Sequence, residues 1–255
     1  MFKYILLILC LISGIAKSGT IDGTKSDQQY LDYGAKHECV VQLYGVYERE
    51  DKDVIFNASA VVFKPSWILT AAHIVQEAKD CAIILKNQKI AVTHIAYHKS
   101  YHENVFAKYD IAIGRLETPT DLNFYPELYS NDDEIGKVCS ISGFGVTGPY
   151  QVSTNKRQSD GKKRAGTNTI ASIQNHLLVC NLTDTKTALE FLICHGDSGG
   201  GLFIDKKLAG INSCIFTDDK VLDANISDES GHTRVSLFID WINTAMEEIE
   251  KKTAK

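Results

Sequence analysis

Proline and methionine are scarce in this chain of 255 residues, with 4 and 2 copies, whereas glycine, phenylalanine and tyrosine occur 18, 10 and 11 times. This balance favours β-strands joined by tight turns. The chain is 44% apolar and 23% charged, as globular proteins are, which excludes collagen, coiled-coil arrays and wholesale disorder. Basic residues are not in excess, since the chain has 27 Lys and Arg and 32 Asp and Glu. We therefore expect no nucleic-acid partner.

Long apolar runs are absent beyond the N-terminus. Lys3 precedes an apolar run over residues 4–12, and small residues follow up to Ala16. The run has about half of the ~20 residues that span a bilayer, so it predicts a signal peptide over residues 1–16 rather than a membrane anchor. Cleavage after Ala16 gives a secreted product, extracellular or periplasmic, with no membrane attachment.

The chain has no CxxC pair, and Cys10 is lost with the signal peptide. Six of the seven cysteines remain, at Cys39, Cys81, Cys139, Cys180, Cys194 and Cys214. An even number in an exported protein favours three disulfides, although six cysteines allow 15 pairings. Zinc is the competing interpretation, but only Cys194 and His195 stand close enough to suggest ligand spacing. We expect no metal and no cofactor.

Three N-glycosylation sequons begin at Asn57, Asn181 and Asn225. They would be modified in a eukaryotic secretory pathway and would mean nothing in a bacterial one.

Short alternating or apolar runs bounded by turns predict an all-β protein. The expected strands are residues 39–44, 54–63, 67–70, 81–85, 90–97 and 111–116, then 137–142, 169–180, 201–204, 207–213 and 233–237. Apolar residues spaced three or four apart predict one helix over residues 237–251. The polar stretch 151–167 predicts a mobile loop, whose basic residues 162–164 are either solvated or an anion patch.

Three short motifs carry the chemistry. Residues 196–200, Gly-Asp-Ser-Gly-Gly, place a serine in a turn where backbone N–H groups can converge on an oxyanion. Residues 70–73, Thr-Ala-Ala-His, put an imidazole after a strand. Asp110 stands at the head of the apolar strand 111–116. Each alone has an ordinary structural explanation, but a serine nucleophile needs a base and the base needs an orienting acid.

With these motifs in the order His73, Asp110, Ser198, the sequence resembles the chymotrypsin-like serine proteases of the trypsin family. Further similarities are Trp-Ile-Leu-Thr-Ala-Ala-His at 67–73, Ser-Gly-Phe-Gly at 142–145, Gly-Ile-Asn-Ser at 210–213 and Thr-Arg-Val-Ser at 233–236. The resemblance covers about residues 21–242, nearly the whole mature chain. Histidines 94, 98 and 102 have helical spacing, but the resemblance places them on a strand end and a loop that bind no metal.

The resemblance implies two six-stranded antiparallel β-barrels and a C-terminal helix. We expect a signal peptide at 1–16, a short propeptide at 17–20 and a peptidase domain at 21–242. The first barrel takes about residues 21–130 and the second about 131–234, with the helix and tail at 235–255. Ser198 would be the nucleophile, His73 its base and Asp110 the orienting acid. The N–H groups of Gly196 and Ser198 would form the oxyanion hole.

The resemblance also implies an activation pair between a new N-terminus at Ile21 and Asp197. Thr20 precedes Ile21 where the family has Arg or Lys, so either another enzyme removes residues 17–20 or signal cleavage exposes Ile21 directly. The expected substrate-binding residues are Leu192, Ile193, His195, Ser213, Cys214, Ile215 and His232. Leu192 stands where trypsins carry Asp, so we expect small or medium apolar side chains before the cleaved bond. The preferred disulfides are Cys39–Cys81, Cys139–Cys180 and Cys194–Cys214.

The prediction is a secreted serine endopeptidase that acts on proteins or peptides, is open to protein protease inhibitors and is a monomer. The alternative is a catalytically silent homologue that binds a partner. All three residues of the triad are present, which favours the enzyme.

Overall fold

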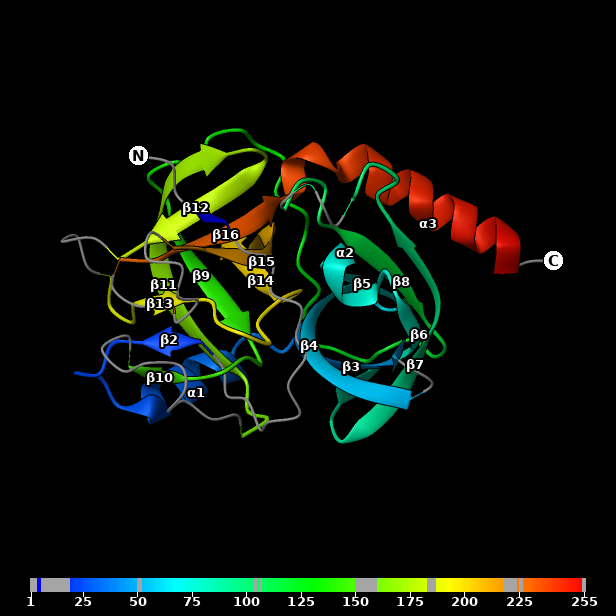
Figure 1. Ribbon diagram of the computed structural model, residues 1–255, viewed down its shortest axis with the longest axis horizontal. Coiled ribbons are helices and arrows are strands. Elements are labelled where there is room, and N and C mark those ends of the chain that lie inside the picture. Colours follow the sequence, from blue (N-terminus) through cyan, green and yellow to red (C-terminus); the bar gives the residue numbers. More distant parts are fainter. Residues whose placement is uncertain are drawn as a thin grey trace.

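The computed structural model describes residues 4–5, 19–49, 52–102, 105, 107–149, 160–182, 187–217, 224 and 227–253. Figure 1 shows two β-barrels side by side, with a C-terminal helix extending across the first. This is the all-β architecture that the sequence predicts.

The first barrel closes in the order β3-β4-β5-β8-β7-β6, and each neighbouring pair is antiparallel. Its strands are β3 (Val40–Arg49), β4 (Lys52–Lys64), β5 (Trp67–Thr70), β6 (Ala78–Leu85), β7 (Gln88–Tyr97) and β8 (Ala112–Leu116). The short helix α2 (Ala72–Val75) follows β5 directly. Apolar residues alternate along β4, so that Phe56, Ala58 and Ala60 are buried in the core.

The second barrel follows the order β15-β14-β9-β11-β12-β16, and pairing of β15 with β16 closes it. The strands are β9 (Val138–Gly143), β11 (Arg164–Gln174), β12 (Leu177–Asn181), β14 (Gly201–Ile204), β15 (Lys207–Thr217) and β16 (Glu229–Arg234). The two-residue strand β1 (Tyr4–Ile5) pairs with the end of β15. A small separate sheet joins β10 (Gly148–Pro149), β2 (Thr20–Ile21) and β13 (Phe191–Leu192).

The predicted loop and one predicted strand need correction. Strand β11 begins at Arg164, so residues 164–167 are not loop, while residues 151–159 lie outside the described part. The expected strand 169–180 is a hairpin of β11 and β12, turned at Asn175 and His176 with φ of 48° and 75°. Two consecutive left-handed residues form the tight turn that matches the twist of paired strands.

Helix α1 (Asp27–Ala35) was not predicted from the sequence. Ser26 and Gln29 form a capping box at its start. Its Gly34 lies so close to β11 that an added Cβ would meet the carbonyl oxygen of Lys163 at 2.7 Å. The helix therefore packs backbone to backbone on the second barrel.

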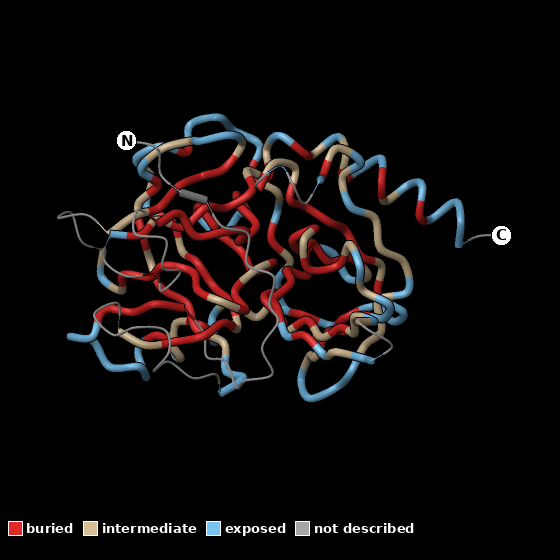
Figure 2. The backbone as a smooth tube through the Cα atoms, viewed as in Figure 1, coloured by how far each residue is buried: buried red, intermediate tan, exposed pale blue. Residues whose placement is uncertain are grey.

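The core lies inside both barrels and beneath the C-terminal segment. In Figure 2 most strand residues of the two barrels are buried, whereas buried and exposed residues alternate along the last helix. A 3₁₀ turn, η2 (Val235–Leu237), leads into α3 (Ile239–Thr253), which buries Ile242, Ala245 and Ile249 against the first core. In the part of the chain that the structure describes, no helix is long and apolar enough to cross a membrane.

Candidate active site

His73 and Asp110 meet at one end of the first barrel. His73 lies on α2, directly after β5, and Asp110 lies just before β8, the strand that pairs with β5. The Nδ1 atom of His73 is 2.8 Å from Oδ2 of Asp110, and the backbone N–H of His73 donates to Oδ1 at 2.9 Å. Pairing of the two strands therefore brings together residues that are 37 positions apart.

Residues of the second barrel hold Asp110 from the other side. Ser213 on β15 donates its hydroxyl to Oδ2 at 2.6 Å, and Thr233 on β16 donates to the Asp110 carbonyl at 2.8 Å. Burial raises the pKa of Asp110, but the charge of His73 and hydrogen bonds from His73 and Ser213 outweigh it, so the pKa lies below its ordinary value. The carboxylate is thus ionised, although it is only 2% exposed.

Tyr109 is a feature of this corner that the sequence did not indicate. Its φ is +61°, a left-handed conformation rare for a bulky residue, and its carbonyl accepts a hydrogen bond from Ile111 at 2.8 Å. The ring stacks on His98 at 4.8 Å and contacts His176 at 5.5 Å. Asp110 therefore sits in a three-residue turn that rings from both barrels hold in place.

Ser198 lies in a glycine turn pressed against β4. Its carbonyl accepts from the backbone N–H of Ser59 at 2.9 Å, and the Ser59 hydroxyl donates to the Gly196 carbonyl at 3.0 Å. Gly199 has φ +82°, and an added Cβ would lie 2.1 Å from Thr70 Oγ1. Since Thr70 is three residues before His73, this close approach places the Ser198 turn beside the end of β5 and the start of α2.

Asp197 is fully buried next to Ser198. Its carboxylate accepts from the N–H groups of Gly145 at 2.8 Å and Cys194 at 2.9 Å. It thereby links the serine turn to the loop after β9.

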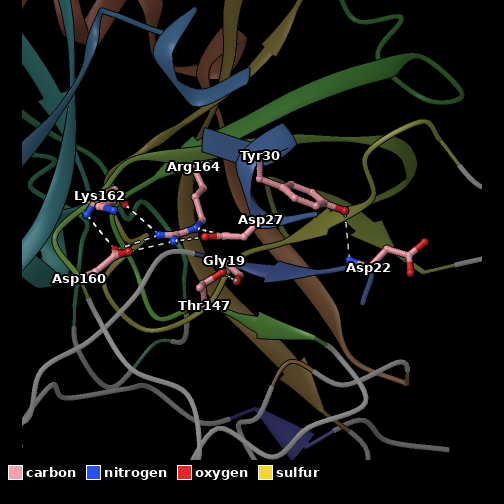
Figure 3. A network of polar contacts seen from close by, with 8 residues as sticks. All are labelled: Gly19, Asp22, Asp27, Tyr30, Thr147, Asp160, Lys162 and Arg164. Atoms are coloured by element: carbon pink, nitrogen blue, oxygen red, sulfur yellow. Dashed lines mark hydrogen bonds and ion pairs between the residues drawn. The ribbon is translucent and has the colours of Figure 1, made fainter. Parts of the chain in front are cut away.

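The N-terminal segment is seated in the second barrel through a polar network (Figure 3). Thr147 donates to the Gly19 carbonyl at 2.6 Å, and Tyr30 accepts from the Asp22 N–H at 3.1 Å. Ile21 pairs with Phe191 in the small sheet, and Thr20 is only 1% exposed. The peptide bond before Ile21 is therefore buried in the uncut chain.

The network of Figure 3 also accounts for the basic residues 162–164. Arg164 is 1% exposed and forms paired ion contacts, at 2.6 and 2.7 Å to Asp27 and at 2.9 Å twice to Asp160. Lys163 donates to the carbonyls of His37 and Val40 at 2.6 and 2.9 Å. Lys162 is exposed, but the last two residues of the basic run are bound inside the protein and are neither solvated nor part of an anion patch.

The expected substrate-binding residues lie on strands β13, β15 and β16 and on the segment before the serine turn. Leu192 is on β13, and Ile193, Cys194 and His195 lead from there to the serine turn. Ser213, Cys214 and Ile215 are consecutive on β15, and Ile215 pairs with Ser230 on β16, a neighbour that the sequence did not indicate. All of these are buried except His195, which is half-buried.

His232 is fully buried behind this group. Its Nδ1 is 2.8 Å from Asn212 Oδ1, and its Nε2 is 3.0 Å from the Ser230 hydroxyl. Burial lowers the pKa of His232 to about 3, so the ring is neutral.

All six described cysteines carry free thiols in the structure. Cys39 precedes β3 and its carbonyl binds Val62, whereas Cys81 pairs with Gly45, six residues further along β3. Six extended residues span about 20 Å, far beyond the ~7 Å that a disulfide allows between Cα atoms, so the pairing Cys39–Cys81 is wrong. The sulfurs of Cys139 and Cys180 lie 3.8 Å apart. The contact with Cys139 and burial both raise the pKa of the Cys180 thiol.

Within the described ranges, no group of three or more His, Cys, Asp or Glu side chains is placed to hold a metal ion. His94 contacts Thr93, and His98 stacks on Tyr109.

Residues 36–242 match the sequence profile of the trypsin family. Among curated proteins, chymotrypsin-like elastase family member 1 of Bos taurus is 30% identical over 218 residues, covering 74% of this chain and 79% of its own. Brachyurin of Leptuca pugilator is 26% identical over 209 residues, covering 75% of this chain and 88% of its own. The chain therefore belongs to the trypsin family. Within that family it is a chymotrypsin-like, serine-type endopeptidase.

Solved structures show the same fold. HL collagenase aligns with a TM-score of 0.66 at 17% identity, over 93% of this chain and 99% of its own. Neuropsin, a serine protease expressed in the limbic system of mouse brain, aligns with a TM-score of 0.64 at 20% identity, over 84% of this chain and 96% of its own.

Proposed function

We propose that this chain hydrolyses peptide bonds with Ser198 as nucleophile, His73 as general base and Asp110 as orienting acid. The observation that carries the proposal is the chain of hydrogen bonds from Ser213 through Asp110 to His73 Nδ1. It fixes the imidazole so that Nε2 is left to take a proton. The Ser198 turn packs against the same strand ends that carry His73.

The reaction follows from these positions. Ser198 attacks the scissile carbonyl while His73 takes its proton, and His73 then protonates the leaving amine. Backbone N–H groups of Gly196 and Ser198 stabilise the oxyanion, each donor contributing about 3 kcal/mol in such enzymes. Water then hydrolyses the acyl-enzyme by the same proton transfers in reverse.

An organophosphorus fluoride tests the nucleophile. It should label Ser198, and Ser198→Ala and His73→Ala should each lose nearly all peptidase activity while remaining folded. An unlabelled Ser198 in a folded protein, or substantial turnover by either variant, would favour the silent homologue instead.

Activation is proposed to require a free α-ammonium at Ile21 that pairs with Asp197. In the uncut chain Thr20 pairs with Leu192, so cleavage before Ile21 also releases the strand at the expected base of the pocket. A preparation that begins at Ile21 should be active, and one that retains residues 17–20 should be much weaker. Equal activity of the two would contradict this mechanism.

The specificity pocket is proposed to prefer small or medium apolar side chains before the cleaved bond. Leu192 offers no carboxylate to Lys or Arg, and an unpaired charge in an apolar site is costly. Ile215 on β15 pairs with Ser230 on β16, and the Ser230 hydroxyl lies 3.0 Å from Nε2 of His232, so we expect Ile215 and Ser230 to narrow the proposed pocket.

A peptide library tests this pocket. Ile215→Gly should raise the preference for Phe over Ala at least tenfold, because one misplaced methylene is worth about 1–3 kcal/mol in discrimination. Dominant cleavage after Arg or Lys by the unchanged enzyme would overturn the proposal, and cleavage after Glu would implicate His195 or His232.

The proposed setting is extracellular or periplasmic. The signal peptide predicted over residues 1–16 supports export, and family membership supports protein or peptide substrates. We propose a monomer that protein protease inhibitors can block.

A further inference from the structure

Asn57 lies on the outer face of β4, two residues before Ser59, which contacts the serine turn. Phe56 and Ala58 point into the first core, so Asn57 and Ser59 share the opposite face. Ser59 is fully buried and contacts both Gly196 and Ser198, whereas Asn57 is exposed. Two strand residues span about 7 Å, so Asn57 marks the point where the contact with the serine turn ends and solvent begins.

Residues 57–59, Asn-Ala-Ser, form a sequon for N-linked glycosylation. Oδ1 of Asn57 accepts a hydrogen bond from Gln42 Nε2 at 3.3 Å, which leaves Nδ2 as the atom that a glycan would occupy. Glycosylation replaces one hydrogen on Nδ2 and keeps Oδ1 as an acceptor. The contact with Gln42 is therefore compatible with a sugar on Asn57.

We infer that Asn57 carries an N-linked glycan at the rim of the active site when the chain passes through a eukaryotic secretory pathway. The donor is a lipid-pyrophosphate-linked oligosaccharide. The bond from sugar C1 to the pyrophosphate oxygen breaks, the bond from C1 to Nδ2 forms, and Nδ2 loses one proton. Transfer must precede folding, because the Ser59 hydroxyl of the sequon is buried in the native protein.

The second sequon offers a contrast. Oδ1 of Asn181 on β12 is buried without a hydrogen-bond partner among the described residues. The third sequon, at Asn225, and Thr183 of the second lie outside the described part. Asn181→Gln, which removes a sequon on β12 of the second barrel, serves as the control.

The glycan has a consequence that rests on the proposed peptidase function. A hydrated oligosaccharide on Asn57 would lie two residues from Ser59, which binds the carbonyls of Gly196 and Ser198, and we expect it to crowd a folded protein that approaches Ser198. A small ester needs little room and passes it. The glycan therefore selects against folded substrates without changing the chemistry at Ser198.

The experiment uses the full chain secreted from insect or mammalian cells. Peptide N-glycosidase converts a glycosylated Asn57 to Asp, which peptide mass spectrometry detects. Four samples are compared: the untreated enzyme, the deglycosylated enzyme, Asn57→Gln and Asn181→Gln. Each is assayed on a small chromogenic ester and on a folded protein.

We expect a glycan on Asn57 and ester hydrolysis within twofold in all four samples. Cleavage of the folded protein should rise at least threefold in the deglycosylated enzyme and in Asn57→Gln, but not in Asn181→Gln. Agreement between the deglycosylated enzyme and Asn57→Gln excludes an effect of the substituted side chain itself.

An unmodified Asn57 in secreted enzyme would overturn the site. A glycosylated Asn57 whose removal leaves folded-protein cleavage unchanged would overturn the size selection. Failure of Ser198 to react with an organophosphorus fluoride would instead count against the proposed function, whatever the state of Asn57.

Discussion

Tyr109 adopts a left-handed backbone directly before the buried carboxylate that binds His73. Such a conformation in an aromatic residue costs about 1–3 kcal/mol and persists only where its surroundings impose it. Here the surroundings are His98 from the first barrel, His176 from the second and Phe238 before α3. The stack therefore holds the backbone directly before Asp110.

Substitution of Tyr109 should separate positioning from binding. Tyr109→Ala should lower kcat about tenfold or more with KM within twofold, because small displacements of catalytic groups are costly. Tyr109→Phe keeps the ring and should retain activity, and Tyr109→Asn should lose less than Ala because Asn tolerates the left-handed region. Tyr97→Ala, which removes a 40% exposed ring on β7, is the control. Normal kcat in Tyr109→Ala would contradict the role.

At the scale of elements, helix α1 is fastened to the second barrel by one buried guanidinium. Arg164 binds Asp27 on the helix and Asp160 on its own segment. Burial raises the pKa of Asp160, but hydrogen bonds from Arg164 and Lys162 reverse this and bring it to about 2. The helix follows the segment that contains Ile21, so the ion cluster holds the region of the proposed activation site.

Arg164→Met should cost about 3 kcal/mol of unfolding free energy, since it leaves two carboxylates facing each other without their cation. Arg49→Met is a matched control, because the Arg49–Glu77 ion pair has a similar 2.6 Å distance but is solvent-exposed. Loss of this exposed ion pair should lower the unfolding free energy by less than about 1 kcal/mol. Urea unfolding measures both values, and equal losses would show that the buried cluster has no special role.

Strands β9 and β12 bring Cys139 and Cys180 together although both pair with β11 between them. Under oxidising conditions this pair should form a disulfide, because it already has its sulfurs in contact. Peptide mapping without reduction should find the link between Cys139 and Cys180 and none between Cys39 and Cys81. A Cys39–Cys81 peptide would contradict the register of β3 and β6.

For the whole molecule, the strand runs were sufficient to predict an all-β protein, and the two barrels followed from the resemblance that the motifs around His73 and Ser198 carry. The terminal helix was placed within two residues of its observed bounds, 239–253. Helix α1 and the hairpin at Asn175 and His176 were missed because tertiary packing decides them: α1 has a weak apolar face and depends on β11 and Arg164. The position of Tyr109 and the pairing of Ile215 with Ser230 depend on strand register, which local patterns do not reveal.

The buried ring of His232 on β16 makes the stability of the whole protein depend on pH in the acid range. Its ring is neutral and held by Asn212 and Ser230, and burial lowers its pKa from 6.5 to about 3. Between these two pH values the unfolded chain binds a proton at His232 that the folded chain does not. The stabilisation is therefore complete above about pH 6.5 and is lost as the pH falls toward 3.

His232→Gln should remove the pH-dependent contribution of His232 to the unfolding free energy, since an amide can keep a hydrogen bond but does not titrate. Urea unfolding at pH 7, 6, 5 and 4 measures the difference. Below pH 6.5 the unfolding free energy of the unchanged protein should fall by about 1.4 kcal/mol per pH unit more than that of the variant. Carboxylates such as Asp110, whose lowered pKa gives a loss of the same sign, are common to both proteins and cancel. Parallel curves would mean that the folded protein accepts the proton at His232, and that the ring is not held in its neutral form.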